Sequence, residues 1–498
     1  MNANLYALLR GHFPDDPGQP CILIPGGPVI HYADLDAASA RIAHALVDAG
    51  CAPGDRIAVQ VDKCWQAIAL YLACLRAGFV YLPLNTAYHR SELGYFFADA
   101  EPTAIVCSPE SADMVSSLRP RAAVLTLDGD AGTLLERAED RADSFETVLR
   151  TPDEPAAILY TSGTTGRSKG AMLSHRNLAS NALTLVDQWG FTRGDVLLHA
   201  LPVYHVHGLF VACHCALLSS SRMLWLKRFD AKEVIARLPQ ATVMMGVPTF
   251  YTRLLAEPGF DRHACRNVRL FVSGSAPLLA ETFAEFRERT GHVILERYGL
   301  TETGMNTANP LAGERVAGSV GQALPGISVR VVGDDGHPCA AGTVGAVQVK
   351  GPNVFTGYWR MPDKTQEEFT SDGYFRTGDL GEWLPNGYLK ISGRAKDLII
   401  TGGLNVYPKE IEEKIDAIPG VAESAVIGLP DPDFGEAVTA VVVPRPGHAL
   451  SETELISALK DEIAGFKVPK RVFFVAALPR NAMGKVQKKV LRETYGET

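Results

Sequence analysis

The segment Tyr160–Gly170 reads YTSGTTGRSKG and combines glycines, hydroxyl side chains and a lysine, which are the residue types that surround phosphate groups. It departs from the common P-loop, G-x-x-x-x-G-K-[ST], because Gly163 and Gly166 are three residues apart and the lysine follows later. A strand is expected before the loop at Ala156–Tyr160, and a helix after it at Arg176–Trp189. This order predicts an anion site near the positive end of the helix. A flexible surface loop is the competing interpretation.

The segment ERYGLTETGMN, at Glu296–Asn306, holds a second set of reactive groups. Gly299 permits a tight turn, and the ring of Tyr298 can face a nucleotide base. The Glu302 carboxylate, between two threonines, suits an oxygen-preferring cation such as Mg²⁺. Taken alone, the segment could equally cap a helix.

Three further motifs lie in the C-terminal third of the chain. In YFRTGDL, Asp379 can accept two ribose hydroxyls, although an aspartate in a type I turn is the simpler alternative. In GRAKDLIITGGLN, the fork of Arg394 suits phosphate and ribose oxygens, and Gly402–Gly403 allow a ligand close to the backbone. In PRNAMGK, Lys485 taken alone would be a solvated surface residue.

The composition excludes several classes of protein. The chain has 498 residues, which suggests two to four structural units. A net charge of -8 argues against a nucleic-acid binder with a broad basic surface. We expect no secretory signal, no membrane insertion and a cytoplasmic protein whose nine cysteines are reduced thiols.

The hydrophobic pattern predicts alternating strands and helices in two series. The expected elements of the first series are the strands 56–61, 80–84 and 104–107 and a helix over 64–77; those of the second are units at 196–201, 222–226, 242–246, 268–273 and 293–296. Short strands between glycines and prolines over 318–380 predict a small antiparallel barrel or sheet. A final α/β region is expected to hold helices at 408–417 and 452–465 and strands at 421–429 and 438–443.

Together the five motifs resemble those of the adenylate-forming superfamily, which includes acyl-CoA synthetases, nonribosomal adenylation domains and firefly-type luciferases. The resemblance runs from about Tyr32 to Lys488 in the expected motif order. It implies an α/β fold with a large N-terminal domain over residues 1–393, made of two βαβ-layered subdomains plus a small β-barrel. A smaller, mobile C-terminal α/β domain would cover residues 394–498 and carry the catalytic lysine.

The resemblance also implies a role for each motif, with ATP, Mg²⁺ and coenzyme A as cofactors. Lys485 would bridge the substrate carboxylate and the α-phosphate, Thr301 would contact that phosphate, and Glu302 would hold the metal. Lys396 would be the hinge. His205 would gate the acyl site, and Gly402, Gly403 and Leu404 would line the coenzyme A tunnel. The remaining nucleotide contacts would be Thr161, Ser162, Gly163, Thr164, Thr165, Gly166, Lys169, Gly274, Ser275, Ala276, Glu296, Tyr298, Gly299, Asp379 and Arg394.

Two arginines indicate which acid is activated. Arg253 and Arg297 lie in segments expected to build the acyl pocket, with His205 and Met305. A buried arginine is costly unless it meets an anion, which predicts a second carboxylate on the substrate. A structural salt bridge is the alternative. The surrounding segments resemble malonyl-CoA synthetases, which implies malonate, or methylmalonate if the pocket tolerates one methyl.

Other functions stay open at this stage. The chain could activate a short or aromatic monocarboxylic acid, load a carrier protein in trans, or be a non-catalytic homologue. The run HVHGLFVACHC could suggest a metal site, but zinc spacing is absent and a buried helix is favoured. Acetylation of Lys485, by an acetyltransferase and reversed by a deacetylase, would remove the charge that adenylation needs. Lys488 and Lys489 are expected to be exposed beside it.

Overall fold

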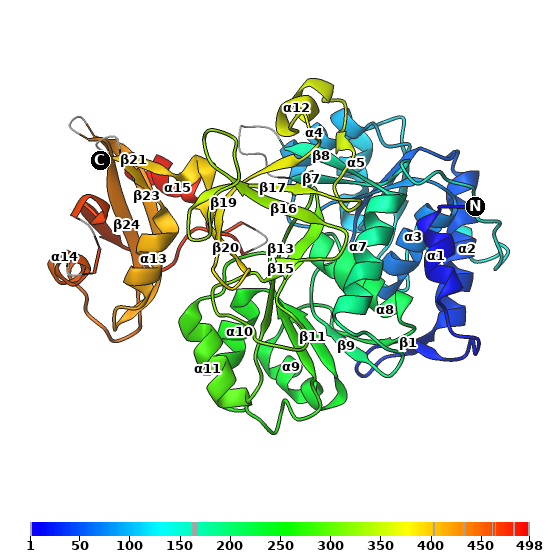
Figure 1. Cartoon of the computed structure of the whole chain (residues 1–498). Coiled ribbons are helices and arrows are strands. Elements are labelled where there is room, and N and C mark those ends of the chain that lie inside the picture. The colour runs from blue at the N-terminus through cyan, green and yellow to red at the C-terminus, as the bar shows by residue number, and fades with distance from the viewer. Residues whose placement is uncertain are drawn as a thin grey trace.

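The computed structural model describes residues 2–161, 168–401, 404–431, 434–460, 462–463, 465–481 and 484–496, without the side chain of Asn405. The chain forms a large body of two sheets with their helices, a separate C-terminal unit, and a smaller sheet that lies between the two (Figure 1). The α/β fold class and its division into a large and a small part are therefore confirmed.

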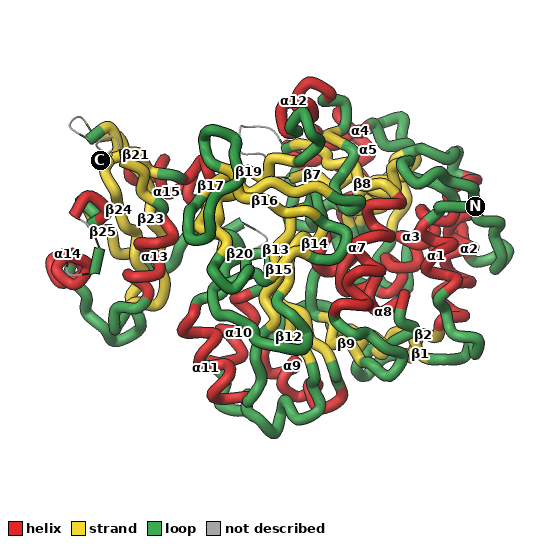
Figure 2. Tube along the Cα trace, in the orientation of Figure 1, coloured by secondary structure: helices red, strands yellow, loops and turns green. Residues whose placement is uncertain are grey.

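The first sheet has seven strands in the order β18-β8-β7-β4-β3-β5-β6. Two of them, β7 and β8, are labelled in Figure 2. Its strands are β3 (Arg56–Gln60), β4 (Val80–Pro83), β5 (Ala104–Cys107), β6 (Ala123–Thr126), β7 (Pro155–Thr161), β8 (Lys169–Ser174) and β18 (Gly357–Tyr358). The N-terminal helices are α1 (Leu5–Gly11), α2 (Tyr32–Asp48), α3 (Trp65–Arg76), α4 (Arg90–Ala100), η1 (Pro109–Ser111), α5 (Ala112–Leu118) and α6 (Thr133–Ala138). The expected strands 56–61, 80–84 and 104–107 and the helix 64–77 are confirmed, with small differences at their ends.

One prediction in this sheet is wrong. The glycine–threonine loop does not lead directly into a helix, because β8 follows it and pairs antiparallel with β7, with Thr161 opposite Lys169. The helix, α7 (His175–Gln188), starts only after β8, where Ser174 caps it as expected. The strands on either side of the loop, β7 and β8, are thus antiparallel neighbours in the sheet. The segment KGAMLS was short enough to be missed, and its residues extend the sheet instead of starting the helix.

The second sheet has nine strands in the order β15-β14-β13-β12-β11-β9-β10-β1-β2. Its strands are β1 (Pro20–Leu23), β2 (Val29–His31), β9 (Val196–His199), β10 (Arg222–Trp225), β11 (Val243–Gly246), β12 (Leu270–Ser273), β13 (Leu295–Leu300), β14 (Gly304–Ala308) and β15 (Gln322–Ala323). Its helices are η2 (His207–Cys213, a π-helix), α8 (His214–Leu218), α9 (Ala231–Arg237), η3 (Leu238–Gln240), α10 (Pro248–Leu255) and α11 (Ala280–Thr290). The five predicted units are confirmed, and β1 joins them by pairing parallel with β10.

The hydrophobic core of the large body contains α3, the most apolar helix of the N-terminal part. Nearly every residue of α3 is buried, in one hydrophobic cluster that joins both sheets. A helix that is apolar on all sides is typical of such a position. In the described part of the chain no helix has both the length and the apolar character needed to cross a bilayer. The nine cysteines are unpaired, and seven of them are buried.

The glycine-rich region forms a four-stranded antiparallel sheet in the order β16-β17-β19-β20. The strands are β16 (Ser328–Val332), β17 (Gly345–Lys350), β19 (Phe375–Trp383) and β20 (Leu389–Arg394), with α12 (Pro362–Glu368) nearby. Of the barrel and the sheet that the sequence left open, the structure has the sheet.

The C-terminal unit has its own sheet and two hydrophobic clusters. It contains η4 (Ala395–Asp397), β21 (Ile399–Thr401), β22 (Leu404–Val406), α13 (Pro408–Asp416), β23 (Val421–Asp431), β24 (Gly435–Pro444), α14 (Glu452–Lys460), η5 (Gly465–Lys467), β25 (Arg471–Phe474) and α15 (Lys488–Tyr495). It contacts the large body through Arg445 and Glu281, 2.8 Å apart, and through Lys390 and Glu413, 3.6 Å apart. The predicted elements are confirmed, although α14 ends earlier than expected.

Candidate active site

A cluster of three polar side chains, Tyr298, Asp379 and Arg394, joins β13 to the small sheet. The Tyr298 hydroxyl donates to the Asp379 carboxylate at 2.5 Å, and the Arg394 guanidinium pairs with the other oxygen at 2.8 Å. Asp379 and Arg394 are directly opposite each other on β19 and β20. Asp379 is 4% exposed, so these two partners hold its carboxylate in one orientation. Three predicted nucleotide contacts, far apart in sequence, are therefore brought together.

The predicted phosphate loop is described only at its two ends. Ser162, Gly163, Thr164, Thr165 and Gly166 lie outside the described residues. Thr161 ends β7, and Lys169 begins β8. Lys169 is buried, with its ammonium 3.3 Å from the Glu368 carboxylate and 4.2 Å from the centre of the Tyr358 ring.

Tyr358 links this lysine to the predicted metal ligand. Its hydroxyl donates to Glu302 Oε1 at 3.0 Å. Burial, reinforced by the negative charge of Glu302, raises the pKa of Tyr358 well above its ordinary value, so the phenol stays protonated and remains a donor. The sequence interpretation missed both Tyr358 and Glu368, because each is nearly 200 residues from the loop and carries no motif of its own.

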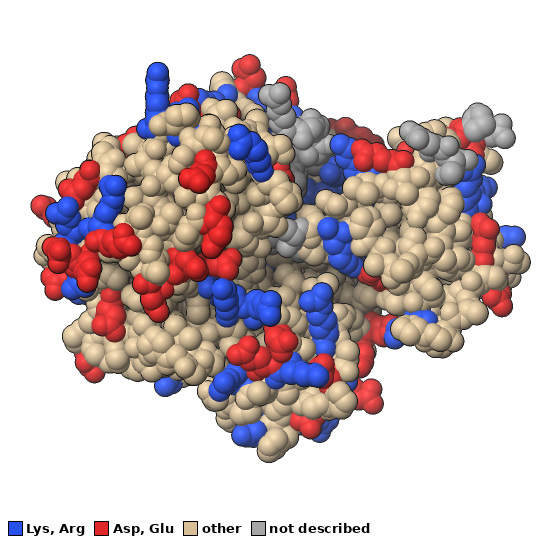
Figure 3. Space-filling view, turned by 180° about the vertical axis from the view of Figure 1, so that it is seen from behind, with Lys and Arg blue, Asp and Glu red and all other residues tan. Residues whose placement is uncertain are grey.

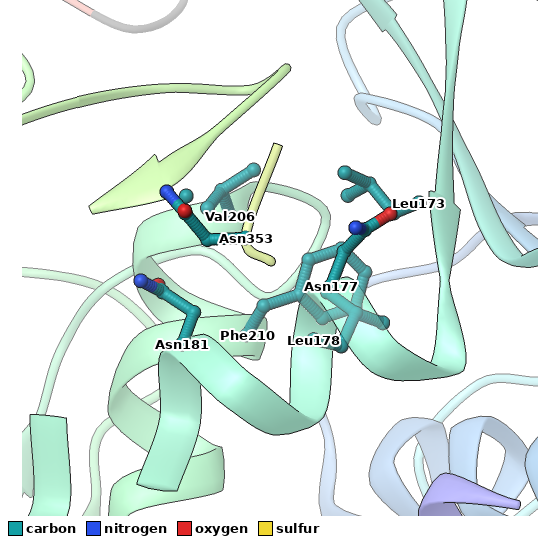
Figure 4. Close-up of a pocket in the computed structure, with 8 residues that line it drawn as sticks. Leu173, Asn177, Leu178, Asn181, Val206, Phe210 and Asn353 are labelled. Carbon is teal, nitrogen blue, oxygen red and sulfur yellow. The ribbon is translucent and has the colours of Figure 1, made fainter. Parts of the chain in front are cut away.

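Two asparagine amides support the hairpin β13–β14, which carries Thr301 and Glu302. Asn181 donates to the Met305 carbonyl at 2.8 Å and accepts from the Met305 amide at 3.0 Å. Asn353 donates to the Thr303 carbonyl at 2.7 Å. A third asparagine, Asn177, instead holds the segment next to Asn353, because it donates to the Val354 carbonyl at 2.7 Å. All three asparagines line a cavity of about 10 Å³ beneath the hairpin (Figure 4). The hairpin is therefore fixed from below by side-chain hydrogen bonds.

Two glycines at the site have steric reasons to be glycine. A Cβ at Gly299 would lie 2.0 Å from the Gly304 carbonyl oxygen, inside the turn of the hairpin. A Cβ at Gly274 would lie 2.5 Å from the Arg297 guanidinium. Gly274, Ser275 and Ala276 follow β12, and Ser275 has a positive φ of 72°. The predicted adenine frame therefore lies against Arg297.

Of the two predicted acyl-pocket arginines, only Arg297 is buried at the site. It is 3% exposed, and burial lowers its pKa to about 9. Its Nε and Nη2 have no hydrogen-bond partner among the described residues, and no ion pair to it is found there. Arg253 is exposed on α10. The structural salt bridge that could have explained Arg297 is thus not seen in this part of the chain.

His205 lies close enough to Arg297 and Lys485 for their positive charges to act on its ring. Burial, Lys485 and Arg297, in that order, lower the pKa of His205 to about 3, so its ring is neutral. Its Nδ1 accepts from the His207 amide at 3.3 Å. Met305 is buried on β14, and its methyl would lie 2.8 Å from a Cβ at Gly299. The charge of Arg297 therefore reaches His205, and Met305 packs against Gly299, two residues after Arg297.

A buried hydrogen-bond chain that sequence reasoning missed supports the His205 segment. Lys63 Nζ lies 2.8 Å from His199 Nδ1, and His199 Nε2 lies 2.9 Å from the Gly208 carbonyl oxygen. If the ammonium donates to Nδ1, Nε2 must carry the proton that it donates to Gly208. Gly208 belongs to the π-helix η2, which confirms the buried helix expected for HVHGLFVACHC. Within the described residues no cluster of three histidine, cysteine or acidic side chains could hold a metal.

Glu296, which precedes Arg297 on β13, is a buried acid. It is 6% exposed, and burial raises its pKa to about 8, although Lys409 of the C-terminal unit opposes the shift. Its Oε1 has no hydrogen-bond partner in the described structure. At neutral pH the carboxyl is therefore largely protonated.

Lys485 faces the site from the C-terminal unit. Burial in the cleft and the charge of Arg394 lower its pKa below the ordinary value, and Asp379 and Glu302 oppose this. The backbone amide of Lys485 donates to Asn481 Oδ1 at 3.0 Å. By accessible surface, however, Lys485 is exposed, so the desolvation that lowers its pKa is incomplete. The fold thus brings the predicted lysine to the group formed by the other motifs.

The surroundings of Lys485 correct one expectation. Lys488 is not an exposed tail residue, because its ammonium pairs with Glu412 at 2.6 Å and its side chain is 17% exposed. Lys489 is exposed as predicted, at 82%. The pair to Glu412 forms because Lys488 starts α15, which packs against β23 of the same unit.

The predicted coenzyme A residues are only partly described. Gly402 and Gly403 lie outside the described residues, and Leu404 is exposed on β22. A separate cavity of about 740 Å³ opens beside the His205 segment. Its lining includes the aromatic Tyr204, Phe229 and Phe250 and the cationic Lys63, Lys227 and Arg228, together with Asp62, which pairs with Lys227 at 3.1 Å. In the view from behind, a hollow separates the large body from the smaller unit, and charges of both signs are interspersed on this face (Figure 3).

The fold and site define a two-part α/β protein that brings the groups predicted to bind ribose and phosphate together with a lysine from its second part. The sequence matches the family described as AMP-binding enzyme over residues 15–359, and the AMP-binding enzyme C-terminal domain over residues 410–485. The chain belongs to the AMP-binding enzyme family.

Three similar proteins cover nearly the whole chain. The mitochondrial malonate–CoA ligase ACSF3 of Mus musculus is 37% identical, over 90% of this chain and 83% of its own. A feruloyl-CoA synthase of Amycolatopsis is 36% identical, over 95% of each. The crystal structure of ATP-bound MatB from Rhodopseudomonas palustris is 55% identical, covers 100% of this chain and 99% of its own, and has a TM-score of 0.98. The apo form of that MatB, with the same identity and coverage, has a TM-score of 0.87.

Proposed function

We infer that the chain forms malonyl-CoA from malonate, ATP and coenzyme A through a malonyl-adenylate, and releases AMP and pyrophosphate. Support comes from the malonate–CoA ligase relative and from the similarity to MatB, whose crystal structure holds ATP. The observation that carries the choice of acid is Arg297, a buried arginine without an acidic partner among the described residues. An aromatic monocarboxylate, as the feruloyl-CoA synthase would suggest, leaves that charge unpaired.

The first step joins two anions. A carboxylate oxygen of malonate attacks the α-phosphorus, and the bond from that phosphorus to the oxygen bridging to the β-phosphorus breaks. Fixed positive charge must therefore face the developing negative charge. In this proposal Lys485 bridges the attacking carboxylate and the α-phosphate, and Thr301 donates to that phosphate. Removal of one such electrostatic group typically costs roughly 10²–10³-fold in rate.

The Glu302 region fits a magnesium ion. Its carboxylate accepts one hydrogen bond, from Tyr358, and forms no ion pair among the described residues, so an oxygen remains free. Mg²⁺ is usually held by one or two carboxylates together with substrate phosphates, which agrees with a site that offers few acidic groups. When bound there, the ion would neutralise phosphate charge.

The nucleotide contacts remain proposals. Asp379 and Arg394 would bind the ribose, and their fixed geometry supports this. Tyr298, Glu296 and Gly299 would lie beside the base together with Gly274, Ser275 and Ala276. The loop between Thr161 and Lys169, with Ser162, Gly163, Thr164, Thr165 and Gly166, would hold the departing pyrophosphate through hydroxyls and amides.

The distal carboxylate of malonate would pair with the Arg297 guanidinium, between His205 and Met305. Arg253 is exposed, so we place it at the rim, where it would attract the dicarboxylate. The buried position of Met305 supports a small acyl group, and methylmalonate would fit only if one methyl is tolerated. Discrimination at this level is worth about 1–3 kcal/mol.

Thioester formation would need the C-terminal domain to rotate. We propose domains 1–393 and 394–498, with Lys396 of η4 as the hinge. The higher TM-score to the ATP-bound form than to the apo form supports the view that the present arrangement serves adenylation. Gly402, Gly403 and Leu404 would then line the thiol channel after rotation. The cationic and aromatic lining of the large cavity suits the phosphates and base of coenzyme A.

The test of this proposal is malonate-dependent ATP–pyrophosphate exchange in Arg297→Lys, Arg297→Ala and Arg253→Ala variants. Both Arg297 variants should raise the KM for malonate and leave the KM for ATP near the wild-type value. Arg253→Ala should have a smaller effect, mostly at low salt. If both Arg297 variants keep the wild-type malonate KM while they remain folded, the carboxylate assignment is wrong.

A regulatory proposal concerns Lys485, the lysine proposed to act in adenylation. Acetylation of Lys485 would remove its charge, and a deacetylase would restore it. Its contact with solvent supports access by an acetyltransferase, and the exposed Lys489 offers a nearby cation. Mass spectrometry of the acetylated enzyme should find the modification at Lys485 together with loss of exchange. Acetylation confined to other lysines would contradict the idea. A cytoplasmic location remains part of the proposal, whereas the mouse relative is named mitochondrial.

A further inference from the structure

Tyr358 lies between the lysine that follows the glycine–threonine loop and the acidic residue of the ERYGLTETGMN hairpin. Its hydroxyl donates to Glu302 Oε1 at 3.0 Å, and the Lys169 ammonium lies 4.2 Å from its ring centre. Tyr358 is 3% exposed and Lys169 is 8% exposed. Water therefore screens these contacts little.

The backbone around Tyr358 is fixed on both sides. Its strand, β18, pairs with β8, with Tyr358 opposite Ala171, and the Trp359 amide donates to the Gly170 carbonyl at 2.8 Å. The Phe355 amide donates to the Glu302 carbonyl at 2.7 Å. The Tyr358 amide donates to Thr365 Oγ1 at 2.9 Å. The segment that carries Tyr358 is thus attached both to the hairpin below the loop and to Glu302 itself.

Lys169 is held against the ring from the other side. Glu368 on α12 pairs with its ammonium at 3.3 Å, and Lys364 lies 3.4 Å from the same carboxylate. A cation over an aromatic face is attracted to the ring and draws electron density from it. A phenol polarised in this way is a stronger donor to the carboxylate that it contacts.

We propose that Tyr358 is a positioning residue for Glu302, and that Lys169, held by Glu368, acts on the metal site through the Tyr358 ring. The inference rests on the proposed function in one respect, which is that Glu302 holds the magnesium ion. One Glu302 oxygen is kept on Tyr358, and the other points to the ligand. Lys169 is then part of the support of the metal ligand and not only a pyrophosphate contact.

The effect of losing such support can be estimated. Groups that hydrogen-bond to a metal-ligating side chain typically contribute roughly 10–100-fold to metal affinity or activity. The Tyr358→Phe variant keeps the ring over which Lys169 lies and removes only the hydroxyl. It should therefore weaken metal binding about tenfold, the lower end of that range, without loss of the fold.

The experiment measures Mn²⁺ binding by electron paramagnetic resonance, with the enzyme saturated by α,β-methylene-ATP, an analogue that cannot be cleaved. Tyr358→Phe should raise the Mn²⁺ dissociation constant about tenfold. The Mg²⁺ concentration for half-maximal pyrophosphate exchange should rise in parallel, and the KM for malonate should not. Lys169→Met should act in the same direction, and the double variant should add little to Tyr358→Phe, because both act on one contact.

Two other variants make the result decisive. Tyr374→Phe removes a hydroxyl that contacts Ser328 at 2.7 Å on an exposed face, and it should leave both metal constants unchanged. Glu302→Gln is the reference. If it weakens Mn²⁺ binding while Tyr358→Phe leaves the constant within twofold of wild type, the positioning role is refuted and the metal assignment stands. If Glu302→Gln itself has no effect, the metal assignment fails and the inference fails with it.

Discussion

The Tyr298→Phe substitution isolates the hydroxyl that orients Asp379, the carboxylate proposed to bind the ribose. The variant retains the aromatic ring beside the proposed base site and removes only the donor to Asp379. Asp379 is nearly inaccessible to water, so no solvent molecule readily replaces the lost hydrogen bond. A hydrogen bond to a charged group contributes about 1.5–3 kcal/mol, which corresponds to roughly 10–150-fold in binding.

The expected effect lies at the lower end of that range. Arg394 still holds the other Asp379 oxygen at 2.8 Å, and this limits how far the carboxylate can turn. We therefore expect the KM for ATP to rise about tenfold, with a smaller change in kcat. Steady-state pyrophosphate exchange at saturating malonate measures both.

A second nucleotide checks the reason for the effect. With 2′,3′-dideoxy-ATP there are no ribose hydroxyls for Asp379 to receive, so Tyr298→Phe should cost much less than with ATP. Tyr388→Phe is the matched control, since that hydroxyl donates to the Glu314 carbonyl in an exposed position. An unchanged KM for ATP, or an equal penalty with both nucleotides, would refute the proposed role of Asp379.

Three other predictions concern stability and the relation of the two domains. Burial raises the pKa of Asp416 to about 7, so the folded chain retains a proton that the unfolded chain loses above about pH 4, and stability falls as pH rises from 4 to 7. Asp416→Asn should remove this pH dependence and increase the free energy of unfolding at pH 8 by on the order of 2 kcal/mol, which thermal melting would detect as a higher melting temperature. A melting temperature that varies with pH as in the wild type would contradict the assignment. Arg445→Ala breaks the exposed pair to Glu281 between the domains, so exchange should fall less than about fivefold at low salt and not at all at high salt; a larger, salt-independent loss would indicate another role. Lys396→Pro fixes one backbone angle at the proposed hinge, and pyrophosphate exchange should persist while malonyl-CoA formation is lost; equal loss of both half-reactions would place the hinge elsewhere.

Most of the fold could be predicted because the signals are local. The strands 56–61 and 104–107 are short apolar runs between turn residues, and Ser174 caps its helix as its side chain predicts. The strand at 169–174 was missed because pairing with β7, a tertiary interaction, determines its conformation. The pairing of β1 with the second sheet depends on contacts across 200 residues, and no local pattern reports these.

In the candidate site too, sequence motifs identified some residues, whereas those defined only by tertiary contacts were missed. Asp379, Arg394, Tyr298 and Glu302 were identified by motif, and the structure brings the first three into direct contact. Tyr358 could not be found in this way, because its role depends on a hydroxyl that reaches a residue 56 positions away. The two acyl-pocket arginines were indistinguishable in sequence. Only their burial, one at 3% exposure and the other exposed, separates them.

The most direct test of the central claim is the specificity of the wild-type enzyme for its acid. The kcat/KM for CoA-thioester formation should be measured by mass spectrometry with malonate, acetate and ferulate as competing acids. Because acetate and ferulate leave the buried Arg297 unpaired, malonate should be preferred by at least about 10²-fold, with AMP as the other product. Equal or greater activity with acetate or ferulate would contradict the account.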